Sequence, residues 1–224
     1  MFKEDELHLD FNVLIQSFPY LLAGAWMTVK ITSLSVAVGI VIGIIGGLMR
    51  VSKNPILYWI STVYVEIIRG TPLLVQIFIV YFGLPSLGLK LTPYLSAVAA
   101  LGINSGAYVS EIVRGGIQSI SRGQMEAARS LGMSYVQAMR YVILPQALVR
   151  ILPPLGNEFI ALLKDSSLVS TIAIAELTRV GQQIITRTFQ SFEIWTGVAL
   201  FYFVMTFIMS RIVRFLESRL AIND

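Results

Sequence analysis

The chain has 224 residues, of which 55% are hydrophobic and 13% are charged, and its mean hydropathy is +0.74. Soluble globular proteins carry about 25% charged residues, so much of this chain's surface faces something other than water. The low charge and the 11% aromatic content exclude intrinsic disorder. Disulfides, zinc–thiolate sites and iron–sulfur clusters are excluded because the chain has no cysteine. The composition predicts an integral membrane protein.

Apolar stretches recur along the chain at lengths that suit membrane-crossing helices, each of which needs about 20 residues. In chain order, the stretches are 20–49, 57–84, 94–110, 151–175 and 194–215. We therefore predict an all-α fold of about five transmembrane helices, with residues 1–224 as one transmembrane domain and 1–18 as an N-terminal interfacial segment.

Lysine and arginine are unevenly divided between the two sets of loops, and they normally accumulate in cytoplasmic loops. We expect the richer set to be cytoplasmic, the N-terminus to be outside and the C-terminus inside, in the cell membrane (the inner one, where a cell has two). The richer set comprises Arg50, Lys53, Arg114, Arg122, Arg129, Arg140, Arg150, Arg211, Arg214 and Arg219; the poorer set comprises Lys3, Lys90, Arg179 and Arg187.

The polar segment 121–145 contains two patterns that begin helices. Ser121 and Ser134 are each followed three residues later by a glutamine, which is the spacing of a reciprocal capping box. Gly132, between them, suits the left-handed conformation that ends a helix. The segment therefore predicts two short helices that meet at an angle, 124–131 and 135–144, with Pro145 ending the second.

Apolar side chains stand out within this polar segment. Met125, Ala127, Ala128 and Leu131 would face either water or another surface. Small alanines and flexible methionines suit a surface that docks into a groove of a partner. The same residues could pack back on the chain's own helices, and the pattern alone leaves both possibilities open.

Three stretches carry a resemblance to a known family. Glu126-Ala127-Ala128, then Gly132 and 142–145 (VILP), is similar to the EAA loop of the membrane subunits of ATP-binding-cassette (ABC) importers; Val142 replaces the isoleucine that the family favours. Residues 66–76 (EIIRGTPLLVQ), and 156–159 with 164–167, resemble the permeases for polar amino acids of the histidine, arginine, lysine and glutamine type. The resemblance extends over residues 19–220.

The resemblance implies a division of labour between subunits. The loop would sit in a cleft of a separate ATPase, and two ATPases closing on ATP would switch two permease subunits between inward- and outward-facing states. Carried over to this chain, the ATPase-coupling residues are Glu126, Ala127, Ala128, Gly132, Met125 and Leu131.

Partners follow from the same resemblance. The chain contains no G-x-x-x-x-G-K-[ST] phosphate loop, so we expect it to be no enzyme and to hold no cofactor, with ATP and Mg²⁺ on the ATPase. The other expected partners are a second permease subunit, identical or not, an extracytoplasmic substrate-binding protein, the amino acid and the bilayer, and no nucleic acid.

The fourth apolar stretch contains charges that are expensive at bilayer depth and are therefore candidates for function. Glu158 and Asp165 are seven residues apart on one helix face, and Asn157 and Lys164 lie on a neighbouring face. We predict that these four and Ser166 bind the ammonium and carboxylate groups of an amino acid. The alternative is that the charges hold the helix bundle together. Two carboxylates favour a basic substrate, whereas glutamine or glutamate would fit equally well if Lys164 engaged Asp165.

Further candidates lie in the second and third apolar stretches. Pro72 should break its helix, and broken membrane helices are tolerated where they line a cavity. We therefore add Gly70, Thr71 and Asn104 to the predicted substrate site, with a simple kink and interhelical packing as the plainer interpretations.

Two features predict packing. Glu66 and Arg69, three residues apart, are expected to form a structural ion pair. The glycines at positions 39, 43 and 47 share one helix face and allow close helix contact, within one subunit or between two.

Two other classes of function remain for comparison. A secondary transporter or channel would explain the charged stretch but gives segment 121–145 no purpose. An intramembrane enzyme is disfavoured, because the H-E-x-x-H motif is absent and the one histidine, His8, is close to the N-terminus.

Overall fold

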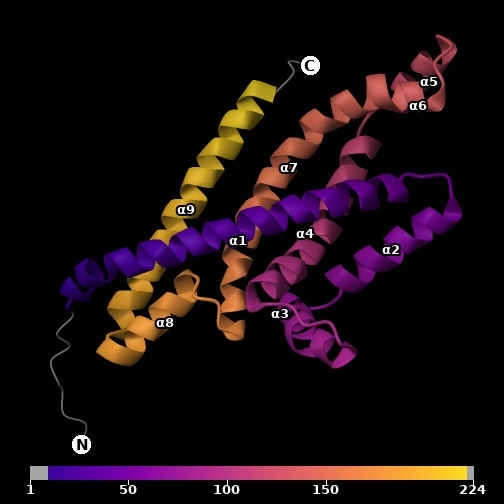
Figure 1. Ribbon diagram of the computed structural model, residues 1–224. Helices are drawn as coiled ribbons and strands as arrows, with labels where there is room; N and C mark the ends of the chain where they lie inside the picture. Colours follow the sequence, from indigo (N-terminus) through magenta and orange to yellow (C-terminus); the bar gives the residue numbers. More distant parts are fainter. Residues whose placement is uncertain (1–9, 221–224) are drawn as a thin grey trace, which may run out of the picture.

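The computed structural model describes residues 10–220, and within this range the regular elements are helical. Figure 1 shows α1 lying obliquely across a bundle in which α7 and α9 run side by side, with α5 and α6 at one end. His8 lies outside the described residues. The elements are α1 (Asn12–Arg50), α2 (Pro55–Arg69), α3 (Leu73–Phe78), the π-helix η1 (Ile79–Gly83), the 3₁₀-helix η2 (Leu84–Leu87), α4 (Pro93–Gln118), α5 (Arg122–Ser130), α6 (Tyr135–Ala138), the π-helix η3 (Met139–Ile143), α7 (Leu144–Asp165), the 3₁₀-helix η4 (Ser166–Ile172), α8 (Leu177–Thr188) and α9 (Ser191–Leu220).

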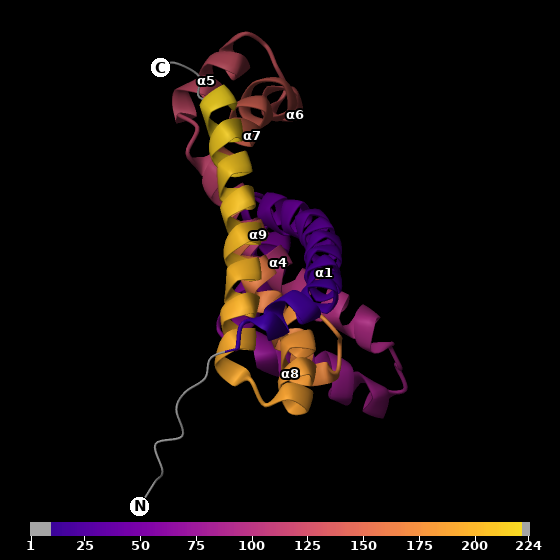
Figure 2. The same ribbon diagram turned by 90° about the vertical axis from the view of Figure 1, so that its left-hand side faces the viewer.

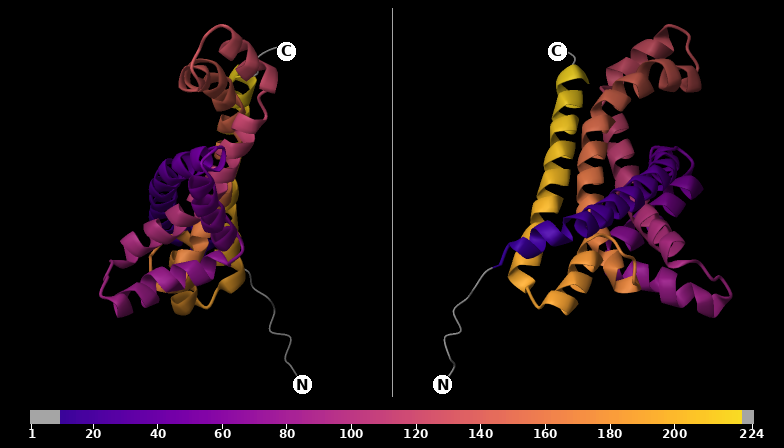
Figure 3. Two further views of the ribbon diagram at one scale, coloured as in Figure 1. Left: turned by 90° about the vertical axis from the view of Figure 1, so that its right-hand side faces the viewer. Right: turned by 60° about the vertical axis from the view of Figure 1, so that its left-hand side comes forward.

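Helix α1 has 39 residues and is therefore about 58 Å long, well beyond the ~30 Å hydrocarbon core of a bilayer. A helix of this length must tilt or bend, and Figures 2 and 3 show α1 curving around the bundle. Its glycine face packs on α4: a Cβ added to Gly39 would lie 2.8 Å from Ser105, and one added to Gly47 would lie 2.6 Å from Val113. The predicted close packing is thus made within the subunit.

The second apolar stretch is broken. The axis turns by 103° between α2 and the helical segment that starts at Leu73. Pro72 interrupts the helical hydrogen bonds after α2, as predicted, because it has no N–H to donate. The break directs the chain back toward α4, which is contacted by both α2 and α3.

By length and composition, α1 and α9 are each able to cross a membrane alone. The bent pair formed by α2 and the segment 73–87 makes a third candidate, either a broken span or a re-entrant loop. Helices α4 and α7, with 26 and 22 residues, reach across about 30 Å by length but are not among the helices apolar enough to cross a membrane alone. The number of five crossings remains a prediction.

The two ends of the molecule differ in content. Figures 2 and 3 show α5, α6 and the last turns of α9 at one end, and α3 and α8 near the other. At the second end, the fully buried Glu176 caps α8: its carboxylate accepts from the backbone N–H groups of Thr178 (2.9 Å) and Arg179 (2.7 Å). The Tyr202 hydroxyl of α9 donates to the same carboxylate over 3.0 Å. This buried acid, which no sequence pattern indicated, joins α8 to α9.

The hairpin α5–α6 agrees only in part with its prediction. Ser134 forms the predicted capping box with Gln137, and Gly132 has φ +84°. Ser121, by contrast, accepts from the N–H of Gly123 over 3.3 Å and forms no reciprocal box with Gln124. The prediction that Pro145 ends the second helix is wrong. Helix α6 runs through the π-helical turn η3 into α7. Because the π-helical turn is wider than an α-helical one, the chain stays helical although Pro145 has no N–H to donate.

Candidate functional site

A pocket of about 340 Å³ lies where the α2–α3 break faces α4 and α7. This volume is within the range of small-molecule sites, roughly 300–1,000 Å³. Pockets of about 390 and 500 Å³ elsewhere are larger, but no carboxylate lines them. The lining residues are Thr71, Pro72, Leu73, Asn104, Tyr108, Glu158, Ala161 and Asp165. Four of the predicted substrate residues, Thr71, Asn104, Glu158 and Asp165, therefore come together in one place.

The charged residues that line the pocket are all acidic. Glu158 and Asp165 line it, and no lysine or arginine does. Within residues 10–220, no ion pair joins Lys164 to Asp165, so the neighbouring cation does not neutralise the pocket by direct contact. Because opposite charges attract, two carboxylates with no basic side chain among the lining residues suit the pocket to a positively charged ligand.

The other four predicted substrate residues do not line the pocket. Asn157 and Lys164 are exposed on the neighbouring face of α7, as their spacing from Glu158 and Asp165 requires. Ser166 is fully buried and donates its hydroxyl to the carbonyl of Leu163 over 2.8 Å. Gly70 belongs to the break itself, with its N–H donating to the Glu66 carbonyl over 2.8 Å.

The break is held by Gln76, a residue that is not among the predicted substrate residues. Its side-chain nitrogen donates to the carbonyls of Ile68 (2.7 Å) and Thr71 (3.1 Å), and its oxygen accepts from Asn104 Nδ2 (2.9 Å). Carbonyls next to a proline break lose their helical hydrogen-bond donors. An amide side chain shortly after the proline, such as that of Gln76, was therefore the sequence signal for a residue that could replace those donors.

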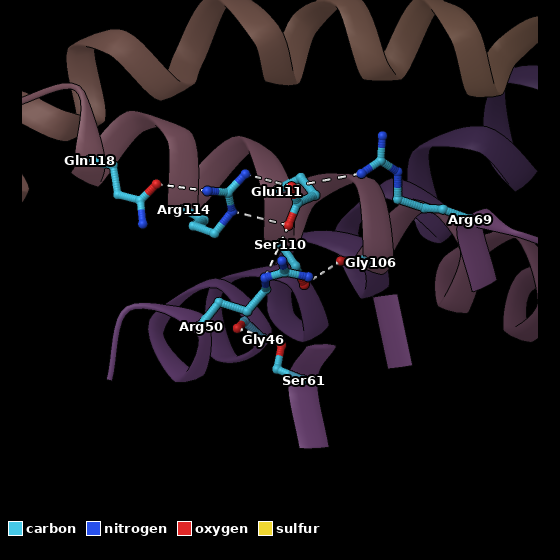
Figure 4. A network of polar contacts seen from close by, with 9 residues as sticks. All are labelled: Gly46, Arg50, Ser61, Arg69, Gly106, Ser110, Glu111, Arg114 and Gln118. Carbon is cyan, nitrogen blue, oxygen red and sulfur yellow. Dashed lines mark hydrogen bonds and ion pairs between the residues drawn. The ribbon is translucent and has the colours of Figure 1, made fainter. Parts of the chain in front are cut away.

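Figure 4 shows a second polar cluster, in which one carboxylate on α4 is surrounded by three guanidinium groups. Glu111 accepts from Arg114 Nη2 over 2.7 Å and lies 3.1 Å from Arg50 Nε and 3.7 Å from Arg69 Nη1. The Arg50 contact is a charge pair that is not aligned for a hydrogen bond. One acid on α4 thereby joins the ends of α1 and α2.

This cluster corrects the predicted pair of Glu66 and Arg69. Among the described residues no ion pair links these two, because the Arg69 side chain extends to α4. There its guanidinium also stacks over the ring of Tyr108, 5.1 Å from the centroid. Since Tyr108 lines the pocket, Arg69 connects the ion cluster to the pocket wall.

The predicted coupling residues of the hairpin divide into two groups. Ala128 is buried and Met125 packs beside the cluster of Ile117, Ile120 and Ile143. Glu126, Ala127, Gly132 and Leu131 are exposed, and Leu131 is 82% exposed. The hairpin therefore packs on its own base through one face and leaves the other open.

Comparison with known proteins places the chain in a family. Residues 39–222 match the family model described as the binding-protein-dependent transport system inner membrane component. The chain belongs to this family. Membership favours an ATP-driven importer over a secondary transporter or channel, and the relatives are transport permeases rather than enzymes.

Individual relatives agree with the family assignment. The chain is 45% identical to the glutamine transport system permease protein GlnP of Escherichia coli (strain K12), covering 96% of this chain and 100% of the relative. It is 39% identical to the arginine transport system permease protein ArtQ of Bacillus subtilis (strain 168), covering 97% and 100%. A crystal structure of an amino acid ABC transporter with histidines matches with a TM-score of 0.90 and 45% identity, covering 95% and 100%.

Proposed function

We propose that this chain is the membrane-spanning permease subunit of an ATP-driven importer that moves a polar, basic amino acid into the cytoplasm. The observation that carries the proposal is the pocket at the α2–α3 break, with two carboxylates and no basic side chain in its lining. The names of the relatives, which specify glutamine and arginine transport, support an amino acid as the substrate.

The charge balance of the pocket favours a basic substrate. An amino acid such as arginine brings two positive groups, one for each of Glu158 and Asp165, and one carboxylate, for which the Tyr108 hydroxyl is an uncharged donor. Glutamine, the substrate in the name of a 45% identical relative, is the second candidate. It would leave one pocket carboxylate without a cation, and Lys164 would have to turn toward Asp165.

The partners are proposed from the family and from the hairpin. Two ATPase subunits, which would hold ATP and Mg²⁺, would each receive the hairpin of one permease subunit, and an external binding protein would deliver the amino acid. Glu126, Ala127, Leu131 and Gly132 are the exposed groups available for the ATPase contact. Ala128 and Met125 would shape the hairpin from within.

The orientation is proposed from charge. The hairpin and the end of α9, both rich in arginine, lie at the same end of the molecule (Figure 2). Because basic residues accumulate on the cytoplasmic side, we assign this end to the cytoplasm and the N-terminus to the outside.

The test is purification of the whole complex from its native membrane, followed by reconstitution and measurement of ATP hydrolysis. We expect an ATPase to co-purify and L-arginine delivered by the binding protein to stimulate hydrolysis. Glu126→Lys should reduce the stimulated rate at least about tenfold, because reversing an interfacial charge costs several kcal/mol.

The matched control is Glu217→Lys, the same charge reversal near the end of α9 and outside the hairpin. It should leave the stimulated rate within about twofold of the parent, because this partly buried acid lies on α9, outside the hairpin. Uptake without any ATPase, or equal rates for Glu126→Lys and the parent, would contradict the proposal.

A further inference from the structure

The Gln76 side chain is held in one orientation by its acceptors. It is only 8% exposed, and its nitrogen lies 2.7 Å from the Ile68 carbonyl and 3.1 Å from the Thr71 carbonyl. A carbonyl oxygen can accept a hydrogen bond but cannot donate one. The end of the amide that faces these two oxygens must therefore be the NH₂ group, whichever way an amide is drawn at first.

The Thr71 hydroxyl is consistent with this orientation. It donates its hydrogen to the Ile67 carbonyl over 2.9 Å, and its oxygen lies 2.9 Å from the same Gln76 nitrogen. A hydroxyl whose hydrogen is used elsewhere is an acceptor. All three neighbours of the Gln76 nitrogen thus accept, and turning the amide around would oppose its oxygen to two carbonyl oxygens, neither of which can donate.

The fixed amide of Gln76 determines that of Asn104. The Gln76 oxygen faces α4, where Asn104 Nδ2 donates to it over 2.9 Å. Turning Asn104 around would bring two amide oxygens together, so its NH₂ group is kept toward Gln76. The Asn104 oxygen Oδ1 is then the atom left for other partners.

That oxygen is available to a ligand. Asn104 lines the pocket, and within residues 10–220 Oδ1 accepts no hydrogen bond and is not one of the polar atoms sealed from solvent. Glu158 and Asp165 line the same pocket. The pocket therefore presents an amide oxygen together with two carboxylates, all of which are acceptors, and an ammonium group has three N–H donors and no acceptor.

We propose that Gln76 is a positioning residue for substrate selection: it holds Asn104 so that Oδ1, rather than the NH₂ group, meets the α-ammonium group of the amino acid. This inference rests on the proposed function. The Gln76 side chain also completes the α2–α3 break, so the same amide that stabilises the bend sets the polarity of one pocket wall.

The test uses the reconstituted complex with its ATPase and measures the Kd of L-arginine by calorimetry. Gln76→Met, which keeps the side-chain length and removes the amide, should raise the Kd about tenfold or more, because hydrogen bonds to charged groups contribute about 1.5–3 kcal/mol. The control Gln146→Met removes an amide that donates to Val142 of its own helical segment, outside the pocket, over 2.8 Å. It should leave the Kd within about twofold of the parent.

A double-variant cycle separates positioning from a purely structural role. In the Asn104→Asp background both terminal atoms of residue 104 are acceptors, so their orientation no longer matters. There Gln76→Met should raise the Kd by no more than about twofold. The same tenfold loss in both backgrounds would overturn the inference, since it would mean that Gln76 acts only by holding the bend.

A second readout applies even if the double variant fails to assemble. L-argininic acid carries a hydroxyl where L-arginine carries the α-ammonium group. Gln76→Met should reduce the preference of the complex for L-arginine over L-argininic acid at least about fivefold, because a freed Asn104 can turn its NH₂ group to the hydroxyl oxygen. An unchanged preference with both Kd values raised equally would overturn the inference. A parent complex that binds neither L-arginine nor L-glutamine would overturn the proposed function itself.

Discussion

The hairpin and the pocket are built in opposite ways. The hairpin's shape depends on contacts between near neighbours, such as the reciprocal bonds of Ser134 and Gln137 and the bond from Arg129 Nη1 to the Met133 carbonyl. The pocket is assembled from the α2–α3 break, α4 and α7, and its central bond joins Gln76 to Asn104, 28 residues away. The shape of the hairpin can be specified by neighbouring residues, whereas a binding site of this kind forms only once the helices have packed.

The largest difference between the two regions is expected in the free energy of unfolding, when one acid in each region is replaced by glutamine. Glu111→Gln removes the acid that joins three guanidinium groups, whereas Glu126→Gln changes an exposed acid on the hairpin. Removing one partner of a buried ion pair costs about 3–5 kcal/mol. Because Arg69 and Arg114 remain partly exposed, we expect about 3 kcal/mol from Glu111→Gln.

Reversible unfolding of the purified complex in mixed micelles measures this difference. Glu126→Gln should change the free energy of unfolding by less than about 0.5 kcal/mol, as exposed surface positions usually do. Equal losses of unfolding free energy in the two variants would mean that the ion cluster around Glu111 does not stabilise the helix packing more than an exposed acid does.

A smaller effect is expected from glycine-to-alanine changes, again one in each region. At Gly43 a Cβ would collide with the Val109 side chain and lie 3.0 Å from the Val109 backbone carbon, so Gly43→Ala should cost about 1–3 kcal/mol by overpacking. At Gly132 nothing lies within 4 Å and only the positive φ of 84° opposes a side chain, so Gly132→Ala should cost about 1 kcal/mol.

Gly132→Asn is the control for this comparison, since asparagine tolerates the left-handed conformation better than alanine does. It should recover part of the loss in the free energy of unfolding. No difference between the alanine and asparagine variants would show that backbone strain at Gly132 is unimportant for the hairpin.

The parts of the structure that could be predicted from sequence are those that depend on local chemistry. The Ser134 capping box, the left-handed Gly132 and the break at Pro72 each follow from a few adjacent residues, and all three are present. Helical periodicity also put Glu158 and Asp165 on one face of α7, which is the face that meets the pocket.

The parts that could not be predicted depend on which helices meet. Lys164, on the neighbouring face of the helix, was expected to share the site with Asp165, yet it does not line the pocket. Arg69 was assigned to Glu66 because they are close in sequence, but its long side chain reaches Glu111 on another helix. The role of Gln76 required knowing that Asn104 lies opposite it. Such partners are chosen by helix packing, which no local pattern encodes.

The most direct test of the proposed function is a comparison of two substrates in one variant. The Kd values of L-arginine and L-glutamine are measured on the reconstituted parent complex and on Glu158→Gln, with Glu66→Gln, an exposed acid outside the pocket, as the control. We predict that Glu158→Gln raises the Kd of L-arginine about tenfold or more, because a charge-assisted bond is lost, and that of L-glutamine by less than about threefold. Equal losses for the two amino acids would contradict the assignment of Glu158 to a cationic substrate.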